Sequence, residues 1–597
     1  MADTILSLFQ RRVEKSRKLP ALRYKEGSVW KDVSWGEYSR RIDDFTRGLL
    51  SLGVKRGDKV GLIGSNTPEW FVSDMAIMTM GATTVPVYAT NSAEQIAYIL
   101  NHSESKIFII EDISYYQRIE KILDKIPSLK YIIVLTGPVD AASGMLISLE
   151  KFLEKGRAVG DEQLKKVHEA VAPDDVAAFI YTSGTTGPPK AVMLTHRNSA
   201  VAAENVGRTI KMKAKETRCP TYLPLSHVAE RTVNLYGNLY TGHVVCFIGG
   251  YAQFIENLPA VRPTLCGGVP RVWEKLYEGI MKYRSTLPEN KRKMVDWALK
   301  TGDQCNQAKY NKRPISPLLS IKYSLARALV INKLLASLGL DKVEIVFTGG
   351  APTSKEILDF YTSVGLWLQD VYGQTEGHGT TSWAMKDDVR FGSAGKPYPL
   401  TKVVLADDGE ILVKGDHVSP GYYKDPELTK ETFKDGWLYS GDLGRFDEDG
   451  FLWVTGRKKD IIITSGGKNI TPSKIESMLL QLPFTEYAIV VGDGKKYLAA
   501  LLLINEETIK SFAEKNGLGS KSFKEIVNSP ELHKAIESHI EMMNAKLSRV
   551  EQIKKFKILD VKFSQDGGEL TPTMKMKRFF IQKKYAREID DLYKSDD

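Results

Sequence analysis

The chain has 597 residues, of which 42% are hydrophobic and 26% charged, and its mean hydropathy is -0.24. This length predicts a large core and at least two folding units, and the composition excludes a disordered or a membrane-spanning protein. The formal net charge of +10 favours anionic partners such as nucleotides, anionic lipid or nucleic acid. No nucleic-acid-binding motif accompanies that charge, so we expect no nucleic-acid partner.

The sequence shows no sign of export or of a membrane span. The first residues lack the apolar core of a signal peptide, and no apolar run reaches the roughly 18 residues of a spanning helix. Residues 594–597 do not form a peroxisomal-type tripeptide. The four cysteines, at 219, 246, 266 and 305, show neither paired nor metal-ligand spacing, as in a reducing compartment. We therefore predict a cytoplasmic protein that can rest on a membrane surface, and nothing indicates its oligomeric state.

From Lys59 to Asp112, short β-type runs alternate with helical patterns. The runs cover residues 60–63, 84–87 and 107–110, and the helical patterns cover 69–80 and 95–101. This alternation predicts a parallel sheet covered by helices. A second series runs from Val176 past Val346 to Tyr372, so we expect two similar α/β layers packed together.

The most informative segment follows the β-type run that starts at Val176. It reads Thr182, Ser183, Gly184, Thr185, Thr186, Gly187, Pro188, Pro189 and Lys190. Glycines let the backbone turn tightly, hydroxyl and amide groups can surround phosphate oxygens, and the lysine adds positive charge. The pattern around it is strand, loop, strand, and GxxxxGK[ST] is absent, so it is not the P-loop of NTPases. We interpret it as a phosphate-binding loop; a plain surface turn is the alternative.

This string resembles the phosphate-loop signature of the adenylate-forming superfamily, which includes acyl-CoA synthetases, adenylation domains of peptide synthetases and beetle luciferases. Ala191 departs from it, since the family usually has glycine after the lysine. The resemblance implies an α/β fold. It consists of a large N-terminal domain, with two packed layers and a small β unit, and a smaller, mobile α/β C-terminal domain. It also implies ATP binding by the residues of the loop.

Three further segments resemble family motifs, in the family's order. Residues 223–231 are similar to the segment that lines the acyl pocket, which implies that His227 lies near the reacting carboxylate. Gly350, Ala351 and Pro352 resemble the turn that approaches adenine. Residues 370–376 resemble a family motif that is much more specific than this turn. There the resemblance implies ATP binding by Tyr372, Gly373, Gln374 and Thr375, with Tyr372 stacked on adenine and Thr375 bonded to the α-phosphate. It also implies Mg²⁺ binding by Glu376, which suits a cation that prefers oxygen ligands.

A basic insertion between Trp273 and Val346 is longer than in short-chain or aryl members of the family. Residues 291–335 contain ten Lys or Arg and two Asp or Glu. Apolar residues are interspersed: Leu318, Leu319, Ile321, Leu325, Leu329 and Ile331. Such a segment suits an anionic membrane surface where an insoluble fatty acid is collected. A packed helical hairpin without membrane contact is the alternative.

The C-terminal third of the sequence contains a predicted small β unit and, after it, the predicted mobile domain. Turn-rich residues 401–446 indicate a small antiparallel β unit, and the resemblance implies that Asp442 and Arg457 hold the ribose. We expect domains at 1–457 and 458–597, and the resemblance implies a hinge at Lys459 and Asp460. Thr471 and Pro472 are typical of the start of a helix whose apolar face contains Ile475, Met478, Leu479 and Leu482.

The resemblance also assigns groups to each half of a reaction. Lys575 matches the family's catalytic lysine, with Lys577 as the alternative, and it would act with Thr375, Glu376 and His227. Ser465, Gly466 and Gly467 would face coenzyme A after the domain rotates. The predicted function is activation of a long-chain fatty acid to acyl-AMP with ATP and Mg²⁺, followed by transfer to coenzyme A.

Other functions share these motifs. The alternatives are a ligase that passes the acyl group to a carrier protein, a luciferase-like oxygenase, and a non-catalytic lipid- or nucleotide-binding descendant. Retention of Lys190, Thr375, Glu376, Asp442 and Lys575 favours an enzyme over the last of these.

Overall fold

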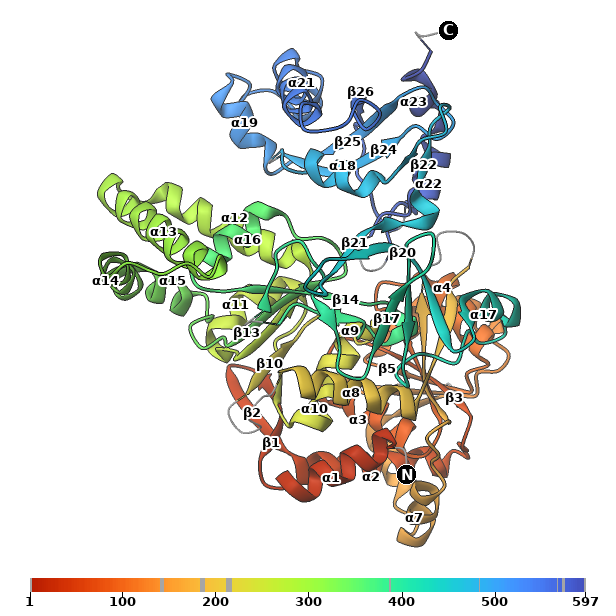
Figure 1. Cartoon of the computed structure of the whole chain (residues 1–597). Helices are drawn as coiled ribbons and strands as arrows, with labels where there is room; N and C mark the ends of the chain where they lie inside the picture. The colour runs from red at the N-terminus through yellow and green to blue at the C-terminus, as the bar shows by residue number, and fades with distance from the viewer. Residues whose placement is uncertain are drawn as a thin grey trace.

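The computed structural model describes residues 3–139, 144–182, 188–210, 217–385, 388–482, 484–565, 567–571 and 575–594. A large N-terminal body carries a smaller C-terminal domain, and the two join through a narrow neck at β20 (Trp437–Phe446) and β21 (Leu452–Arg457) (Figure 1). The predicted α/β class, with one large and one small domain, is confirmed.

The first layer of the large body is a mostly parallel sheet with the strand order β7-β6-β5-β3-β4-β8-β9. Its strands are β3 (Lys59–Ile63), β4 (Thr83–Val87), β5 (Ile107–Ile110), β6 (Tyr131–Val134), β7 (Leu146–Ser148), β8 (Val176–Thr182) and β9 (Lys190–Thr195). Helices α2 (Trp35–Ser51), α3 (Pro68–Thr79), α4 (Ala93–Ser103), α5 (Ile113–Ile119), α6 (Leu149–Gly156) and α7 (Asp161–Glu169) belong to this layer. The three predicted strands agree with β3, β4 and β5, whose apolar runs are continuous because parallel strands are covered on both faces.

The prediction that the second series starts at Val176 is wrong, because that strand, β8, pairs with β4 in the first layer. The second layer is divided into two sheets, which the sequence did not predict. One has the order β10-β11-β1-β2 and the other β12-β13-β14-β15-β16. Their strands are β1 (Pro20–Glu26), β2 (Val29–Ser34), β10 (Arg218–Thr221), β11 (Val244–Phe247), β12 (Leu265–Gly268), β13 (Ile345–Gly349), β14 (Leu368–Tyr372), β15 (Ser382–Trp383) and β16 (Lys396–Pro397). The accompanying helices are α1 (Ile5–Ser16), α8 (His196–Ile210), α9 (Val228–Glu230), the π-helix η2 (Arg231–Tyr236), α10 (Gly237–Thr241), α11 (Tyr251–Val261), α12 (Pro270–Thr286) and α16 (Lys355–Ser363). The N-terminal hairpin β1–β2 therefore closes a sheet whose other strands lie two hundred residues later in the chain.

The basic insertion forms a helical arm that projects from the large body (Figure 1). It comprises α13 (Glu289–Tyr310), α14 (Pro317–Ala326), the π-helix η3 (Arg327–Ile331) and α15 (Asn332–Ser337). Tyr323, Ala326 and Val330 are buried in the same apolar cluster as Ala298 and Cys305 of α13. The arm is thus a packed helical unit, and its outer face is considered below.

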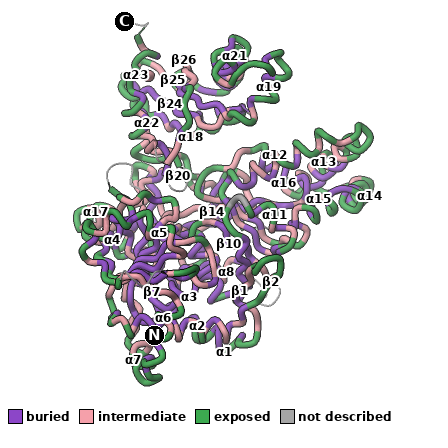
Figure 2. The backbone as a smooth tube through the Cα atoms, turned by 180° about the vertical axis from the view of Figure 1, so that it is seen from behind, coloured by how far each residue is buried: buried purple, intermediate pink, exposed green. Residues whose placement is uncertain are grey.

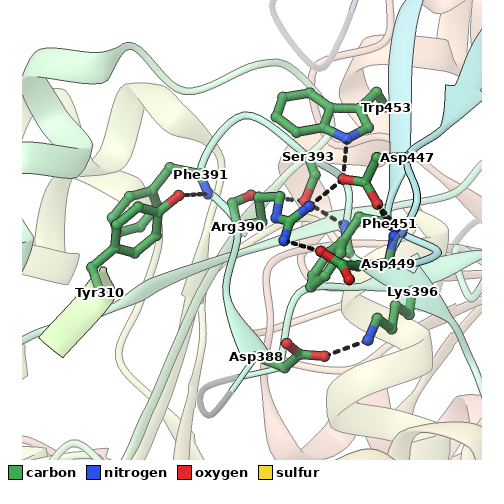
Figure 3. Close-up of polar contacts among 11 residues, drawn as sticks. Tyr310, Asp388, Arg390, Phe391, Ser393, Lys396, Asp447, Asp449, Phe451 and Trp453 are labelled. Carbon is green, nitrogen blue, oxygen red and sulfur yellow. Dashed lines mark hydrogen bonds and ion pairs between the residues drawn. The ribbon is translucent and has the colours of Figure 1, made fainter. Parts of the chain in front are cut away.

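Aromatic and ionic contacts tie the base of the arm to the small β unit (Figure 3). Tyr310, the last residue of α13, stacks on Phe391 with ring centres 4.9 Å apart, and its hydroxyl accepts a 3.2 Å hydrogen bond from the Phe391 amide. The adjacent Arg390 donates to Asp447 at 2.7 Å and to Asp449 at 2.5 Å, in the turn between β20 and β21. The arm and the neck are therefore fixed to one loop.

The small β unit is antiparallel, as predicted, but it extends further than residues 401–446. Its strands are β17 (Lys402–Leu405), β18 (Glu410–Lys414), β19 (Phe433–Lys434), β20 and β21, and it carries α17 (Pro426–Thr432). β21 pairs with β20 so that Arg457 lies opposite Asp442. The predicted ribose residues are therefore neighbours in one sheet.

The C-terminal domain is built on the sheet β24-β25-β26. Its elements are β22 (Ile462–Ile463), β23 (Asn469–Ile470), α18 (Pro472–Leu479), β24 (Thr485–Val491), β25 (Leu498–Ile504), α19 (Ile509–Lys515), α20 (Phe523–Val527), α21 (Pro530–Asn544), β26 (Ile553–Ile558), α22 (Arg578–Lys584) and α23 (Ala586–Asp591). Thr471 stands at the N-cap of α18 as predicted, although its side chain makes no capping hydrogen bond. Ile475, Leu479 and Leu482 are buried beneath this helix.

The four cysteines are buried free thiols. Within the ranges described above, none of the helices has both the length and the apolar character that crossing a membrane requires.

Candidate active site

A wide cleft separates the large body from the C-terminal domain, and many of the predicted site residues line it. These are Thr182, Lys190, His227, Gly350, Ala351, Pro352, Gly373, Gln374, Thr375, Glu376, Asp442, Arg457, Lys459, Asp460 and Lys575. They come from strand ends and loops of both layers, the neck and the C-terminal domain. Segments nearly four hundred residues apart in sequence therefore meet at one surface.

Residues on both flanks of the predicted phosphate loop line this cleft. Ser183, Gly184, Thr185, Thr186 and Gly187 fall outside the described residues. Its flanks, Thr182 and Lys190, are direct partners in the antiparallel pair β8–β9, so the predicted strand-loop-strand arrangement is correct. The methyl group of Ala191 is buried in this pair, and the departure from glycine is accommodated.

The segment after β14 forms an acidic corner of the cleft. The backbone at Gly379 passes so close to Gly373 that a Cβ on Gly373 would lie 2.4 Å from the backbone carbon of Gly379, so this position requires glycine. Glu376 follows in a short 3-10 turn, and its Oε1 accepts a 2.7 Å hydrogen bond from the Tyr422 hydroxyl. The Lys190 ammonium lies 6.0 Å from the centre of the Tyr422 ring. The tyrosine thus orients the carboxylate beside the phosphate-loop lysine.

Asp442 is a carboxylate of the cleft that neighbouring side chains hold at both of its oxygens. The Tyr372 hydroxyl donates a 2.7 Å hydrogen bond to its Oδ2, and Arg457 Nε lies 3.2 Å from its Oδ1. Only 6% of Asp442 is exposed, and this burial raises its pKa although Arg457, Tyr372 and Lys575 each act in the opposite direction. Tyr372 therefore lies directly beside the predicted ribose carboxylate.

Lys575 reaches into the cleft from the C-terminal domain. A Cβ built on Gly350 would lie 3.8 Å from the Lys575 ammonium, so the turn after β13 leaves space for it. The Lys575 amide donates to the Thr571 hydroxyl at 3.0 Å, and the Lys575 carbonyl accepts from the Thr571 amide at 2.8 Å. Surrounding protein and the Arg457 charge lower the pKa of Lys575, while Asp442 raises it.

Lys577, the alternative catalytic lysine, also lines the cleft, and its amide donates to the Glu569 carbonyl at 2.8 Å. The Lys575 ammonium, by contrast, lies beside Gly350 and is close enough to Asp442 and Arg457 for their charges to act on its pKa. The geometry therefore favours Lys575 as the lysine that faces the nucleotide residues.

The cleft that His227 lines also has an apolar part, which is called the apolar recess below. It is lined by Val206, Val233, Phe347, Val371, Trp383 and Tyr398. His227 caps α9 by accepting a 3.2 Å hydrogen bond from the Ala229 amide at Nδ1. Burial and the nearby Lys575 charge lower the pKa of His227 to about 4, so its imidazole is neutral at pH 7.

Not every residue of the predicted acyl-pocket segment faces this recess. Leu223, Val228 and Ala229 line the cleft, whereas Arg231 turns into the core. There it forms a fully buried ion pair with Asp74 at 2.6 Å, which anchors the start of the π-helix η2. One part of the segment therefore lines the cleft, and its end anchors the segment in the core.

Ser465, Gly466 and Gly467 lie outside the cleft lining in this structure. They form the turn between β22 and β23, where the Ser465 amide donates to the Lys495 carbonyl at 2.9 Å. The predicted hinge residues Lys459 and Asp460 form a short 3-10 turn directly after β21. The C-terminal domain therefore presents Lys575 to the cleft and its glycine turn elsewhere.

Sequence reasoning missed three groups that support the site. Tyr422 holds Glu376, and Glu410 accepts hydrogen bonds from the Gly441 amide at 2.8 Å and from Lys458 at 2.9 Å. Within the C-terminal domain, Arg578 donates hydrogen bonds to both carboxylate oxygens of the buried Glu476, at 2.5 and 2.6 Å. No local pattern marks these residues, since each depends on a partner far away in the sequence.

The donor set of the cleft fits Mg²⁺ that arrives with a nucleotide. Glu376 offers hard oxygen atoms, and a magnesium ion held by one carboxylate takes its other ligands from phosphates and water. No group of three or more His, Cys, Asp or Glu residues suited to a metal ion occurs in the part of the chain that the structure describes.

Comparisons with known proteins agree with this arrangement. The family model described as AMP-binding enzyme matches residues 9–423, and that of the AMP-binding enzyme C-terminal domain matches residues 459–597. The chain belongs to the AMP-binding enzyme family.

Two curated relatives of this AMP-binding enzyme are similar over nearly its whole length. The long-chain-fatty-acid–CoA ligase ACSBG2 of Xenopus laevis is 34% identical, over 99% of this chain and 84% of the relative. The long-chain-fatty-acid–CoA ligase FadD15 of Mycobacterium bovis is 35% identical, over 95% and 93%.

Solved structures share the fold of the AMP-binding enzyme at low identity. The anthranilate CoA ligase AuaEII, in complex with anthranoyl-AMP, has a TM-score of 0.74 and 18% identity over 99% of each chain. The O-succinylbenzoate coenzyme A synthetase MenE of Bacillus subtilis, in complex with ATP and magnesium ion, has a TM-score of 0.67 and 20% identity, over 96% and 98%. At these identities the likeness concerns the fold.

Proposed function

We propose that this AMP-binding enzyme activates a long-chain fatty acid with ATP to acyl-AMP and transfers the acyl group to coenzyme A, releasing AMP and pyrophosphate. The observation that carries the proposal is the meeting of Lys575, Asp442 and Glu376 in a cleft that also has an apolar part. Similarity to long-chain-fatty-acid–CoA ligases over nearly the whole chain supports the choice of acid.

In the first half-reaction, a fatty carboxylate attacks the α-phosphorus of ATP and pyrophosphate leaves. No general base is needed, because a carboxylic acid with a pKa near 4 is already ionised at neutral pH. The obstacle is repulsion between two anions, and fixed cations are the means to overcome it. Lys575 would bridge carboxylate and α-phosphate, with Lys190 and the loop from Ser183 to Gly187 on the β- and γ-phosphates.

The remaining groups would bind and orient the nucleotide. Asp442 has both carboxylate oxygens directed by Tyr372 and Arg457, which suits it to accept hydrogen bonds from ribose hydroxyls. Gly350, Ala351 and Pro352 would approach the adenine, beside Tyr372, Gly373 and Gln374. Thr375 would donate to the α-phosphate, and Glu376 would hold Mg²⁺, which neutralises phosphate charge when bound.

His227 would act as a neutral wall group at the mouth of the acyl recess. Because its pKa lies near 4, it carries no charge that would repel Lys575 at neutral pH. A neutral imidazole can donate one hydrogen bond to a carboxylate oxygen and so orient it for attack.

In the second half-reaction, the coenzyme A thiol attacks the acyl carbon of the mixed anhydride and AMP leaves. The C-terminal domain, residues 458–597, would rotate about Lys459 and Asp460, taking Lys575 out and bringing Ser465, Gly466 and Gly467 in. Gly467 has a φ of +71°, so the turn depends on glycine, and the absence of side chains would leave a narrow channel for the pantetheine arm.

The test is pyrophosphate release and thioester formation from Mg-ATP and acids of increasing chain length, with and without coenzyme A. We expect thioester only with coenzyme A, with a maximum at one long chain length. Adenylate without thioester would favour the ligase that serves a carrier protein, light emission with a cyclic acid would favour the oxygenase, and no turnover with any acid would favour the non-catalytic descendant.

A further inference from the structure

The outer face of the helical arm is apolar although it faces solvent. Leu318, Ile321, Leu325 and Leu329 are 63%, 60%, 50% and 47% exposed. Their spacing of three or four residues places them along one side of α14 and η3. Isolated exposed leucines are common in proteins, but a continuous row of this kind marks an interaction surface.

The opposite side of the same helix is already occupied. Tyr323, Ala326 and Val330 are buried against α13, and Leu319 packs partly against the same cluster. Of the apolar residues named in the sequence analysis, Ile331 also belongs to this inner side. A helix that is apolar on both sides is normally enclosed by protein or by lipid, yet the arm lies at the rim of the molecule (Figure 2).

The charge around the apolar row indicates what kind of surface the row contacts. No aspartate or glutamate occurs between Asp303 and Asp341, whereas Lys309, Lys312, Arg313, Lys322, Arg327 and Lys333 lie in that interval. All six are exposed. In a twofold-symmetric contact between two copies, this patch would face itself and oppose like charges. An anionic bilayer instead accepts both the apolar row and its basic surround.

We propose that the row Leu318–Ile321–Leu325–Leu329 is a membrane-docking surface that inserts into the headgroup region of an anionic bilayer, with Lys322 and Lys333 on lipid headgroups. Docking is independent of the chemistry in the cleft, since none of these residues lines it. The contacts of Tyr310 and Arg390 fix the arm to the body, so docking orients the whole enzyme at the surface (Figure 3).

The first test is co-sedimentation with vesicles of phosphatidylcholine containing phosphatidylserine, and with vesicles of phosphatidylcholine alone. We expect binding to the anionic vesicles, and about tenfold weaker binding for Ile321→Gln with Leu325→Gln, because two inserted side chains become polar. The matched control is Met542→Gln with Val550→Gln in the C-terminal domain, whose side chains are 63% and 46% exposed. The control should bind as the unmodified enzyme does.

The charge component has its own test. Lys322→Glu with Lys333→Glu should weaken binding to anionic vesicles about tenfold or more and remove most of its salt dependence. Turnover of a short, soluble fatty acid should be unchanged in both arm variants, which separates docking from catalysis and from misfolding.

Three results would overturn the proposal. These are absence of vesicle binding by the unmodified enzyme, equal binding by the arm variants, and a dimer in solution that the Ile321→Gln, Leu325→Gln pair converts to monomers without vesicle binding. The last would show that the row is an interface between two copies.

Discussion

The two sides of the cleft are held in different ways. On the large body, the candidate nucleotide residues are fixed by the fold: Asp442 is 6% exposed and hydrogen-bonded to Tyr372, and Glu376 is held by Tyr422. On the C-terminal side, Lys575 stands on a loop of a domain that reaches the body through one narrow neck (Figure 1). A rigid side suits groups that bind ATP throughout, and the proposed rotation of the C-terminal domain, here called the movable side, suits a group needed in only one half-reaction.

The largest effect is expected when the Lys575 cation of the C-terminal domain is removed. Lys575→Ala should reduce acyl-adenylate formation about a thousandfold, because one fixed charge that stabilises the transition state is lost. ATP binding should change only slightly, since the large body keeps its own nucleotide groups. Adenylate formation is measured as fatty-acid-dependent exchange between pyrophosphate and ATP.

Lys577→Ala is the matched control, because it removes a lysine from the same loop and the same cleft. It should retain most of the exchange activity. If Lys577→Ala is the inactive variant and Lys575→Ala the active one, the assignment of the catalytic lysine is reversed.

The rigid side is tested by Asp442→Asn. The neutral amide pairs poorly with Arg457 and with ribose hydroxyls, so ATP binding should weaken about ten- to a hundredfold. Asp408→Asn, an exposed carboxylate that pairs with Lys458 in the same β unit, is the control and should bind ATP normally. Equal loss in both variants, seen by titration calorimetry, would indicate general damage to the β unit.

The movable side is tested by stiffening its connection. Lys459→Pro fixes one backbone angle in the turn after β21 and should reduce thioester formation about tenfold more than adenylate formation. Lys459→Ala removes the same side chain and leaves the backbone free, so it should affect neither half-reaction. Equal loss in both half-reactions for the proline variant would place the pivot elsewhere.

The sequence predicted the elements and motifs of this enzyme better than the contacts between them. Strands β3, β4 and β5 were predictable because parallel strands are continuous apolar runs. The grouping of Lys190, Glu376 and Lys575 followed from motif order. Burial of the acidic Glu476 was not predictable, because its partner Arg578 lies 102 residues further along the chain.

The same reasoning explains the helical arm. Its basic composition was evident, but whether Leu319 or Ile321 faces outward depends on which side of α14 packs against α13. Likewise, the hairpin β1–β2 joins the second layer because β1 pairs with β11, and neither strand carries a local mark of the other.

The smallest effect is expected from an ion pair that helps to hold the C-terminal domain in its present position. Lys275 of α12 lies 3.8 Å from Glu507 of the C-terminal domain, with both side chains in contact with solvent. Reversing one charge, as Lys275→Glu, should lower adenylate formation relative to thioester formation by about two- to fivefold, because an exposed ion pair contributes little. Combining Lys275→Glu with Glu507→Lys should restore the ratio, and added salt should reduce the difference between all variants. If the double variant has the same ratio as Lys275→Glu alone, this ion pair does not hold the C-terminal domain. The neck would then determine the position of the domain in both half-reactions.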